Sequence, residues 1–245
     1  RPFLLTCQHK APHRSWMPAP EHLDLFDGVE IPEPATLFDD YATRTEAARE
    51  QELEIDRHMY FFYDLKLPPV DPNAELEGPD RWTAGALERL TPEQRARFEA
   101  AFVDENAAFR AAGLEGRELV RWKYQRYIKN YLRCVAGVDD SVGRLLEWLD
   151  ANGLAENTVV VYSSDQGFFL GEHGWYDKRF MYEPSLRMPL IVRWPGRVAP
   201  GTRVEALTQN VDFAPTFLEL AGVAADARHQ GHSLVPLLCG EDPAE

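Results

Sequence analysis

The spacing of apolar residues predicts alternating helices and strands in the second half of the chain. From Tyr124 to Leu149, apolar residues recur at alternating steps of four and three, which is the spacing of one face of a long α-helix, and Gly153 is the expected stop. Two apolar runs, Thr158 to Tyr162 and Met188 to Trp194, predict strands, the first of them fully buried. Residues 211 to 220 predict a short helix that ends at a glycine.

The first half carries weaker signals. The apolar run Phe3 to Cys7 predicts a buried strand, and one helix is expected between Tyr41 and Phe62, in a stretch rich in Pro, Asp and Glu. Thr91 predicts a helix start, because a hydroxyl cap precedes a proline and Gln94 can complete a capping box. That helix is expected to end near Gly113.

This order of elements predicts an α/β fold with a mainly parallel sheet flanked by helices, since helix, strand, strand and helix follow one another as in crossover units. With 245 residues, 44% of them apolar, the chain can form one large domain or two small ones. We expect two core pieces, residues 1–17 and 120–245, and a largely helical insertion over residues 18–119.

Charge limits the partners. A formal net charge of −14 argues against nonspecific binding of nucleic acid or of anionic membranes, so an anionic substrate needs a local positive pocket. No apolar stretch in the sequence approaches the roughly 20 residues of a membrane span. Three widely spaced cysteines form neither a metal motif nor an even disulfide framework.

Asp165 and Gln166 directly follow the predicted strand at Thr158 to Tyr162, where open α/β sheets place their ligands. Carboxylate and amide oxygens suit a hard cation, Ca²⁺ or alternatively Mg²⁺, which needs further ligands. The alternative is that both side chains only cap the turn before Gly167.

The glycine-rich loop that follows carries His173, Lys178 and Arg179, which could direct donors toward an anion near that cation. The alternative is a solvated charged face. His9 and His13 follow the first predicted strand and could be catalytic or merely structural. The residue types together indicate cation-assisted attack on an oxyanion ester.

Several stretches resemble the C-terminal half of the type I, formylglycine-dependent sulfatases of the alkaline phosphatase superfamily. The matching stretches are Val161–Gly167, Leu170–Gly174, Asp177–Arg179 and Met188–Gly196, with His9–His13, Val138–Gly143, Asp212–Thr216 and Gly231–Leu234 in the same order around them. The resemblance implies the alkaline phosphatase-like fold, here incomplete.

The resemblance also implies roles for individual residues. Asp165 and Gln166 correspond to calcium ligands, Lys178 to a lysine that holds the sulfate, and His13 to a histidine that contacts the sulfate and protonates the leaving alcohol. His173 and Arg179 correspond to residues that line the sugar subsite or touch the sulfate.

One motif of the family is absent from the sequence. No Cys or Ser is followed by Pro two residues later and by Arg four residues later, which is the motif that yields formylglycine. We therefore expect that the nucleophile and the rest of the calcium site belong to an N-terminal remainder of the same protein, which would be a partner of this chain.

The expected function is hydrolysis of sulfate esters of a small molecule or glycan, with this chain inactive by itself. One alternative is a phosphate or phosphonate ester hydrolase of the same superfamily; another is a noncatalytic metal- or partner-binding remnant. A periplasmic or extracellular location follows from the resemblance only.

Overall fold

The computed structural model describes residues 3–76 and 78–241, which fall into two compact units. Residues 9–143 and 166–187 form the first, called the helical unit below. Among the described residues, the terminal unit consists of 3–8, 144–165 and 188–241. The chain passes from one unit to the other between residues 8 and 9, within α5 between residues 143 and 144, between residues 165 and 166, and between residues 187 and 188.

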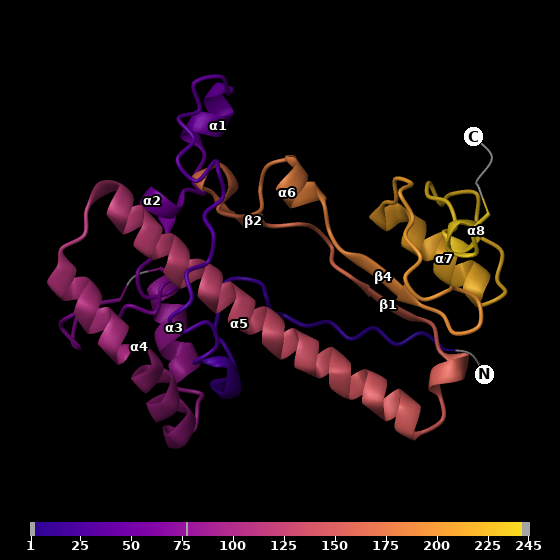
Figure 1. Ribbon diagram of the computed structural model, residues 1–245, viewed down its shortest axis with the longest axis horizontal. Coiled ribbons are helices and arrows are strands. Elements are labelled where there is room, and N and C mark those ends of the chain that lie inside the picture. The colour runs from indigo at the N-terminus through magenta and orange to yellow at the C-terminus, as the bar shows by residue number, and fades with distance from the viewer. Residues whose placement is uncertain (1–2, 77, 242–245) are drawn as a thin grey trace. The chain divides into compact units, whose positions relative to one another are not determined.

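Helices outnumber strands in the described residues (Figure 1). In chain order the elements are η1 (Pro20–His22), α1 (Glu46–Glu50), α2 (Ile55–His58), α3 (Pro79–Leu87), α4 (Pro92–Ala112), α5 (Gly116–Ala151), η2 (Ala155–Asn157), β1 (Val160–Ser163), β2 (Phe169–Leu170), η3 (Glu172–Gly174), β3 (Tyr176–Asp177), α6 (Glu183–Leu186), β4 (Leu190–Arg193), η4 (Asn210–Asp212), α7 (Phe213–Leu220) and α8 (Val235–Leu238).

The predicted helices α4 and α5 are confirmed. At the start of α4, the Gln94 amide donates to Thr91 Oγ1 at 3.2 Å and the Thr91 amide to the Gln94 side chain at 3.0 Å, so the capping box is complete. The left-handed Gly113 (φ 57°) ends this helix. Gly153 (φ 65°) follows two residues after the end of α5.

The helical unit has its main core on the apolar stripe of α5. This cluster consists of Trp16, Leu37, Ile55, Met59, Leu65, Val120, Tyr124, Tyr127, Ile128, Cys134 and Tyr176. The Tyr127 hydroxyl donates to the carbonyl of Phe169 at 2.7 Å, which fixes β2 against the helix. The loop around Trp16 and the strand β3 therefore share one core.

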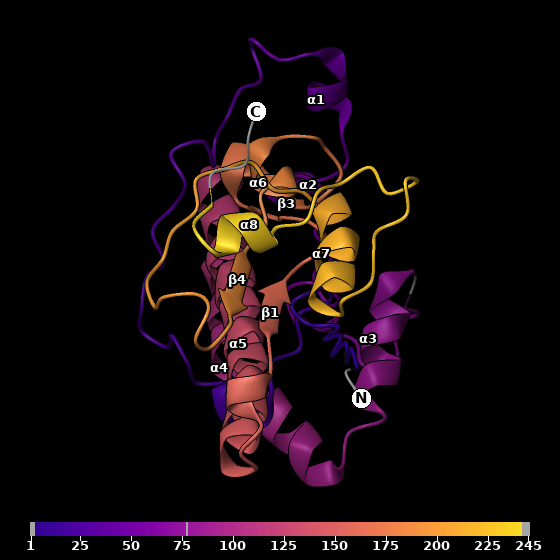
Figure 2. The same ribbon diagram turned by 90° about the vertical axis from the view of Figure 1, so that its right-hand side faces the viewer.

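The terminal unit contains the pair β1 and β4, followed along the chain by α7 and α8 (Figure 2). The strands pair in antiparallel register from Val160 opposite Arg193 to Ser163 opposite Leu190. The Leu234 amide donates to Thr216 Oγ1 at 2.8 Å, which joins the segment before α8 to α7.

Four details differ from the sequence predictions. Residues 3–7 form no strand, and Phe3 is 88% exposed, because this run pairs with none of the described strands and its apolar side chains are not packed in a core. The expected single helix at 41–62 is two short ones, α1 and α2, separated by extended Gln51. The strand at 158–162 is only half-buried.

The fourth detail concerns strand direction. Among the described residues, both ladders, β1 with β4 and β2 with β3, are antiparallel. Parallel neighbours need a crossover connection between strands of one sheet. In each described ladder the two strands run in opposite directions, so the parallel pairing predicted from the element order is not found in the described residues.

Candidate functional site

The loop from His9 to Arg14 is fixed by its own last residue. Arg14 reaches the buried carboxylate of Asp64, with Nε donating to Oδ1 and Nη2 to Oδ2, both at 2.6 Å. The backbone carbonyl of Arg14 accepts hydrogen bonds from His13 Nδ1 at 2.7 Å and from Lys10 Nζ at 3.1 Å. Since a carbonyl oxygen only accepts, Nδ1 of His13 carries the proton and the lone pair of the neutral ring lies on Nε2.

The second part of the candidate site is the charged end of β3. The Lys178 ammonium lies 3.7 Å from Asp177 Oδ1 and 5.7 Å from the centre of the Phe168 ring. Arg179 Nη2 donates to Asp177 Oδ2 at 3.0 Å, although its side chain is mostly exposed. Asp177 is 2% exposed and Oδ1 is buried without a hydrogen-bond donor.

Two contacts join these parts within the helical unit. The Arg14 guanidinium carbon lies 4.8 Å from the centre of the Tyr176 ring, and Tyr176 directly precedes Asp177. Trp16 meets Phe168 edge to face at 6.3 Å between ring centres. The segment with His13 and the segment with Lys178 therefore pack on the same aromatic core.

His173 lies in the left-handed turn of η3 (φ 59°) and is fixed by its neighbours. Its Nδ1 lies 2.8 Å from Asp39 Oδ2, and its amide donates to Thr36 Oγ1 at 3.0 Å. Burial alone would raise the pKa of Asp39, but hydrogen bonds from His173, from the Tyr41 amide and from Arg44 lower it overall.

Asp165 and Gln166 fall on different units. Asp165 is exposed in the terminal unit, where its backbone carbonyl accepts from Asn210 Nδ2 at 2.8 Å and Oδ1 accepts from Ser164 Oγ at 3.3 Å. Gln166 belongs to the helical unit. Their oxygen donors suit calcium in kind, but within the described residues no three His, Cys, Asp or Glu side chains gather as a metal site. These two residues alone cannot provide the six to eight ligands that calcium takes.

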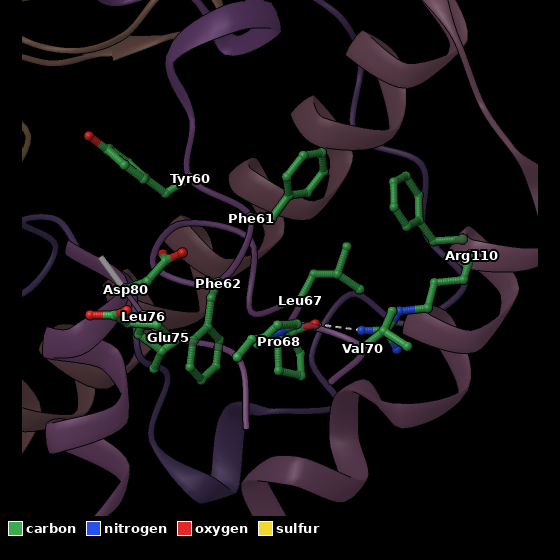
Figure 3. Close-up of a pocket in the computed structure, with 13 residues that line it drawn as sticks. Tyr60, Phe61, Phe62, Leu67, Pro68, Val70, Glu75, Leu76, Asp80 and Arg110 are labelled. Atoms are coloured by element: carbon green, nitrogen blue, oxygen red, sulfur yellow. Dashed lines mark hydrogen bonds between the residues drawn. The ribbon is translucent and has the colours of Figure 1, made fainter. Parts of the chain in front are cut away.

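A pocket of about 610 Å³ lies elsewhere in the helical unit (Figure 3). It is lined mainly by apolar side chains, several of them aromatic, and the lining residue Arg110 donates from Nη2 to the Pro68 carbonyl. None of the site residues predicted from the sequence lines it. Tyr60 belongs both to the pocket lining and to the surroundings of Arg14, because the centre of its ring lies 5.7 Å from the Arg14 guanidinium carbon.

Sequence reasoning missed Asp64, Arg14 and Asp177 as members of this neighbourhood. Asp64 lies fifty residues from Arg14 along the chain, and no spacing rule connects them. Asp177 could have been noticed, since a carboxylate directly before Lys178 and Arg179 is readable in the sequence.

The helical unit thus contains a histidine with an available Nε2, an ammonium, a guanidinium and an acceptor carboxylate, groups that suit the binding of an oxyanion and the transfer of a proton. Comparison with known proteins agrees with this chemistry. The family model for the C-terminal part of N-sulphoglucosamine sulphohydrolase matches residues 171–245. Within the part of the chain that the structure describes, every helix is too short or too polar to span a bilayer.

Among curated proteins, an N-acetylglucosamine-6-O-sulfatase of Bacteroides thetaiotaomicron is 46% identical over 247 residues, covering 100% of this chain and 44% of that protein. The human N-acetylglucosamine-6-sulfatase is 31% identical over 172 residues, covering 65% of this chain and 30% of that protein.

Two solved structures are also similar to this chain. BT4656, solved in complex with its substrate D-glucosamine-2-N,6-O-disulfate, aligns with a TM-score of 0.89 at 45% identity, over 96% of this chain and 48% of that one. A phosphonate monoester hydrolase from Silicibacter pomeroyi aligns with a TM-score of 0.50 at 29% identity, over 75% of this chain and 34% of that one.

The chain belongs to the sulfatases, with the alkaline phosphatase-like fold, and corresponds to their C-terminal part. It spans less than half the length of these relatives. The resemblance to sulfatases and the incomplete alkaline phosphatase-like α/β fold that it implies are confirmed, although the described ladders are antiparallel.

Proposed function

We propose that the protein containing this chain hydrolyses sulfate esters of amino sugars, with a 6-O-sulfated glucosamine unit as the substrate class. The relatives at 46% and 31% identity are named as N-acetylglucosamine 6-sulfatases, and the BT4656 complex contains a 6-O-sulfated glucosamine. The observation that carries the proposal is the packing of the His13 segment and the Lys178 segment on one core, joined by Arg14 and Tyr176.

In this proposal Lys178 binds the sulfate group. An ammonium held beside Phe168 and mostly shielded from solvent neutralises charge that develops on the sulfuryl oxygens during S–O cleavage. As the imidazolium ion, which carries a second proton on Nε2 in addition to the one on Nδ1, His13 donates the Nε2 proton to the leaving sugar oxygen and returns to the neutral ring. The hydrogen bond from Nδ1 to the Arg14 carbonyl holds the ring in the required orientation.

The sugar ring would be recognised by the groups around Asp177. Its buried Oδ1 lacks a donor, so a substrate hydroxyl can supply one. Arg179 is anchored on the other oxygen of the same carboxylate and keeps further N–H groups for a hydroxyl or a sulfate. His173, held by Asp39, is proposed as a further donor in this subsite.

Calcium, or alternatively magnesium, would be held in part by Asp165 and Gln166, whose oxygen donors fit a hard cation. Such a cation supplies charge neutralisation at the sulfate when bound. The formylglycine nucleophile expected from the family would come from residues outside this sequence. The chain alone should therefore be inactive, and the N-terminal remainder of the protein is its proposed partner.

A phosphonate or phosphate monoester hydrolase is the second candidate, supported by the structural match to the phosphonate monoester hydrolase. The higher identity to the 6-sulfatases favours sulfate esters. The two are separated by comparing kcat/KM of the full-length protein on glucosamine 6-sulfate and on a phosphonate monoester. A higher value for the phosphonate ester would refute the proposed substrate class.

Variants of the full-length protein test the proposed residues. Lys178→Ala and His13→Ala should each lower kcat on glucosamine 6-sulfate by about tenfold or more, with unchanged thermal unfolding. Lys129→Ala, on α5 outside the site, is the matched control and should retain the wild-type rate. Unchanged rates for the two site variants would show that their assigned roles are wrong.

A further inference from the structure

The ion pair between Arg14 and Asp64 is reinforced by several further contacts. The Asp64 side chain is fully buried, and its Oδ2 also accepts from the Tyr60 amide at 2.8 Å. The guanidinium carbon lies 5.1 Å from the Tyr63 ring centre, in addition to its contacts with Tyr60 and Tyr176. Burying a charged pair gives little net stability, because desolvation offsets the attraction, so geometry is the more evident benefit.

The partners of Arg14 lie on both sides of the candidate site. Its carbonyl holds His13 Nδ1 and Lys10 Nζ, whereas its side chain rests on Tyr176, one residue before Asp177 and two before Lys178. Tyr176 is itself fixed, since its hydroxyl donates to the His58 carbonyl at 2.8 Å and its amide to the Leu53 carbonyl at 2.9 Å. One residue therefore connects the proposed general acid to the strand that carries the proposed sulfate-binding lysine.

We propose that Arg14 is a positioning residue, which acts through its ion pair with Asp64 to hold the His13 imidazole in the orientation needed to protonate the leaving oxygen. The inference rests on the proposed function. It adds a residue that contacts neither the sulfate nor the sugar and that acts on catalysis through its backbone carbonyl.

Leaving-group dependence separates this role from a merely structural one. A sugar alkoxide is a poor leaving group and needs a proton from the general acid, whereas 4-nitrophenolate leaves readily without one. Loss of His13 orientation should therefore slow glucosamine 6-sulfate much more than 4-nitrophenyl sulfate. Loss of folded enzyme lowers both rates by the same factor.

The experiment uses the full-length protein and both substrates. Arg14→Lys keeps the charge but loses the two-pronged contact with Asp64. It should lower kcat on glucosamine 6-sulfate by about tenfold, change KM by less than about threefold, and lower kcat on 4-nitrophenyl sulfate by less than about threefold. Asp64→Asn should give the same selective loss.

Two further variants control for folding. Arg14→Met/Asp64→Leu replaces the buried pair with apolar groups and should remain folded, yet show the same selective loss. Arg121→Lys, which changes an exposed arginine paired with Glu33 and placed over the Phe38 ring, should change neither rate.

A double variant tests whether Arg14 acts through His13. In a His13→Ala background, Arg14→Lys should produce no further loss on glucosamine 6-sulfate, because the group that it orients is absent. Equal losses on both substrates, full activity of the folded Arg14→Met/Asp64→Leu protein, or additive losses in the double variant would each overturn the inference. A wild-type protein that cleaves neither sulfate ester would instead refute the proposed function, and the inference with it.

Discussion

Lys66 offers a quantitative test of the energetics of the helical unit. Its side chain is buried at 2% exposure in the described structure, and its ammonium donates to the Tyr63 carbonyl. Burial, only partly offset by the nearby charge of Asp64, lowers the pKa of Lys66 from 10.5 to about 8. At pH 7 the Lys66 side chain is therefore still protonated in the folded protein, and this protonated form is less favourable there than in the unfolded chain.

The size and sign of the effect follow from linkage. A pKa of about 8 in place of 10.5 corresponds to a penalty of about 3 kcal/mol in the free energy of unfolding at neutral pH. Between pH 8 and 10.5 the unfolded chain binds more protons than the folded one, so stability rises with pH and the penalty disappears. Lys66→Met removes the cation but also the bond to the Tyr63 carbonyl, which costs about 1 kcal/mol.

Lys66→Met should therefore be more stable than wild type by about 2 kcal/mol at pH 7, and less stable by about 1 kcal/mol above pH 10.5. Urea unfolding of both proteins, followed by tryptophan fluorescence at pH 7, 9 and 10.5, measures the difference, in which other titrating groups cancel. Lys66→Arg stays charged throughout and should be less stable than wild type at every pH, with the gap widening as the pH rises. A wild-type to Met difference that is constant across this range would refute the reasoning.

Two further stability predictions concern backbone geometry and capping. Gly167→Ala would place a Cβ 2.2 Å from the Pro184 carbonyl oxygen and 2.3 Å from that of Arg187, so we expect a loss of about 2 to 3 kcal/mol in urea unfolding. Gly85→Ala in α3, with no atom within 4 Å, is its control and should stabilise by about 0.5 to 1 kcal/mol; equal effects would contradict the clash. Thr91→Ala removes the capping box of α4 and should cost about 1 kcal/mol, with Thr91→Ser restoring most of it. A neutral Thr91→Ala in thermal unfolding would mean that α4 does not depend on its cap.

The sequence predicts an element correctly where the interactions that define it join residues close together in the chain. The cap at Thr91 and the left-handed Gly113 fix the ends of α4 through contacts a few residues apart, so the pattern alone predicts the helix. The stripe from Tyr124 to Leu149 does the same for α5. The strand expected at Phe3–Cys7 is not formed. An apolar run becomes a buried strand only where a neighbouring strand pairs with its backbone and another layer covers its side chains, and the run itself does not encode those partners.

In the candidate site, too, contiguous motifs could be predicted from the sequence and contacts between distant residues could not. The motif around Lys178 is contiguous and could be recognised from the sequence, as could His13. The arrangement that joins them could not, because Arg14 and Asp64 meet across fifty residues and Tyr176 comes from a third segment. Asp39 beside His173 is a similar case, separated by 134 positions.

The core position of Cys134 gives the helical unit an internal probe of its opening. Burial raises the pKa of this thiol to about 11, whereas Cys7 and Cys239 are exposed. A chromogenic disulfide reagent should thus modify two thiols at once and the third only when the packing around α5 transiently opens. The slow phase of that reaction would report the transient opening of the core of the helical unit, with no need for an engineered cysteine or an attached fluorophore.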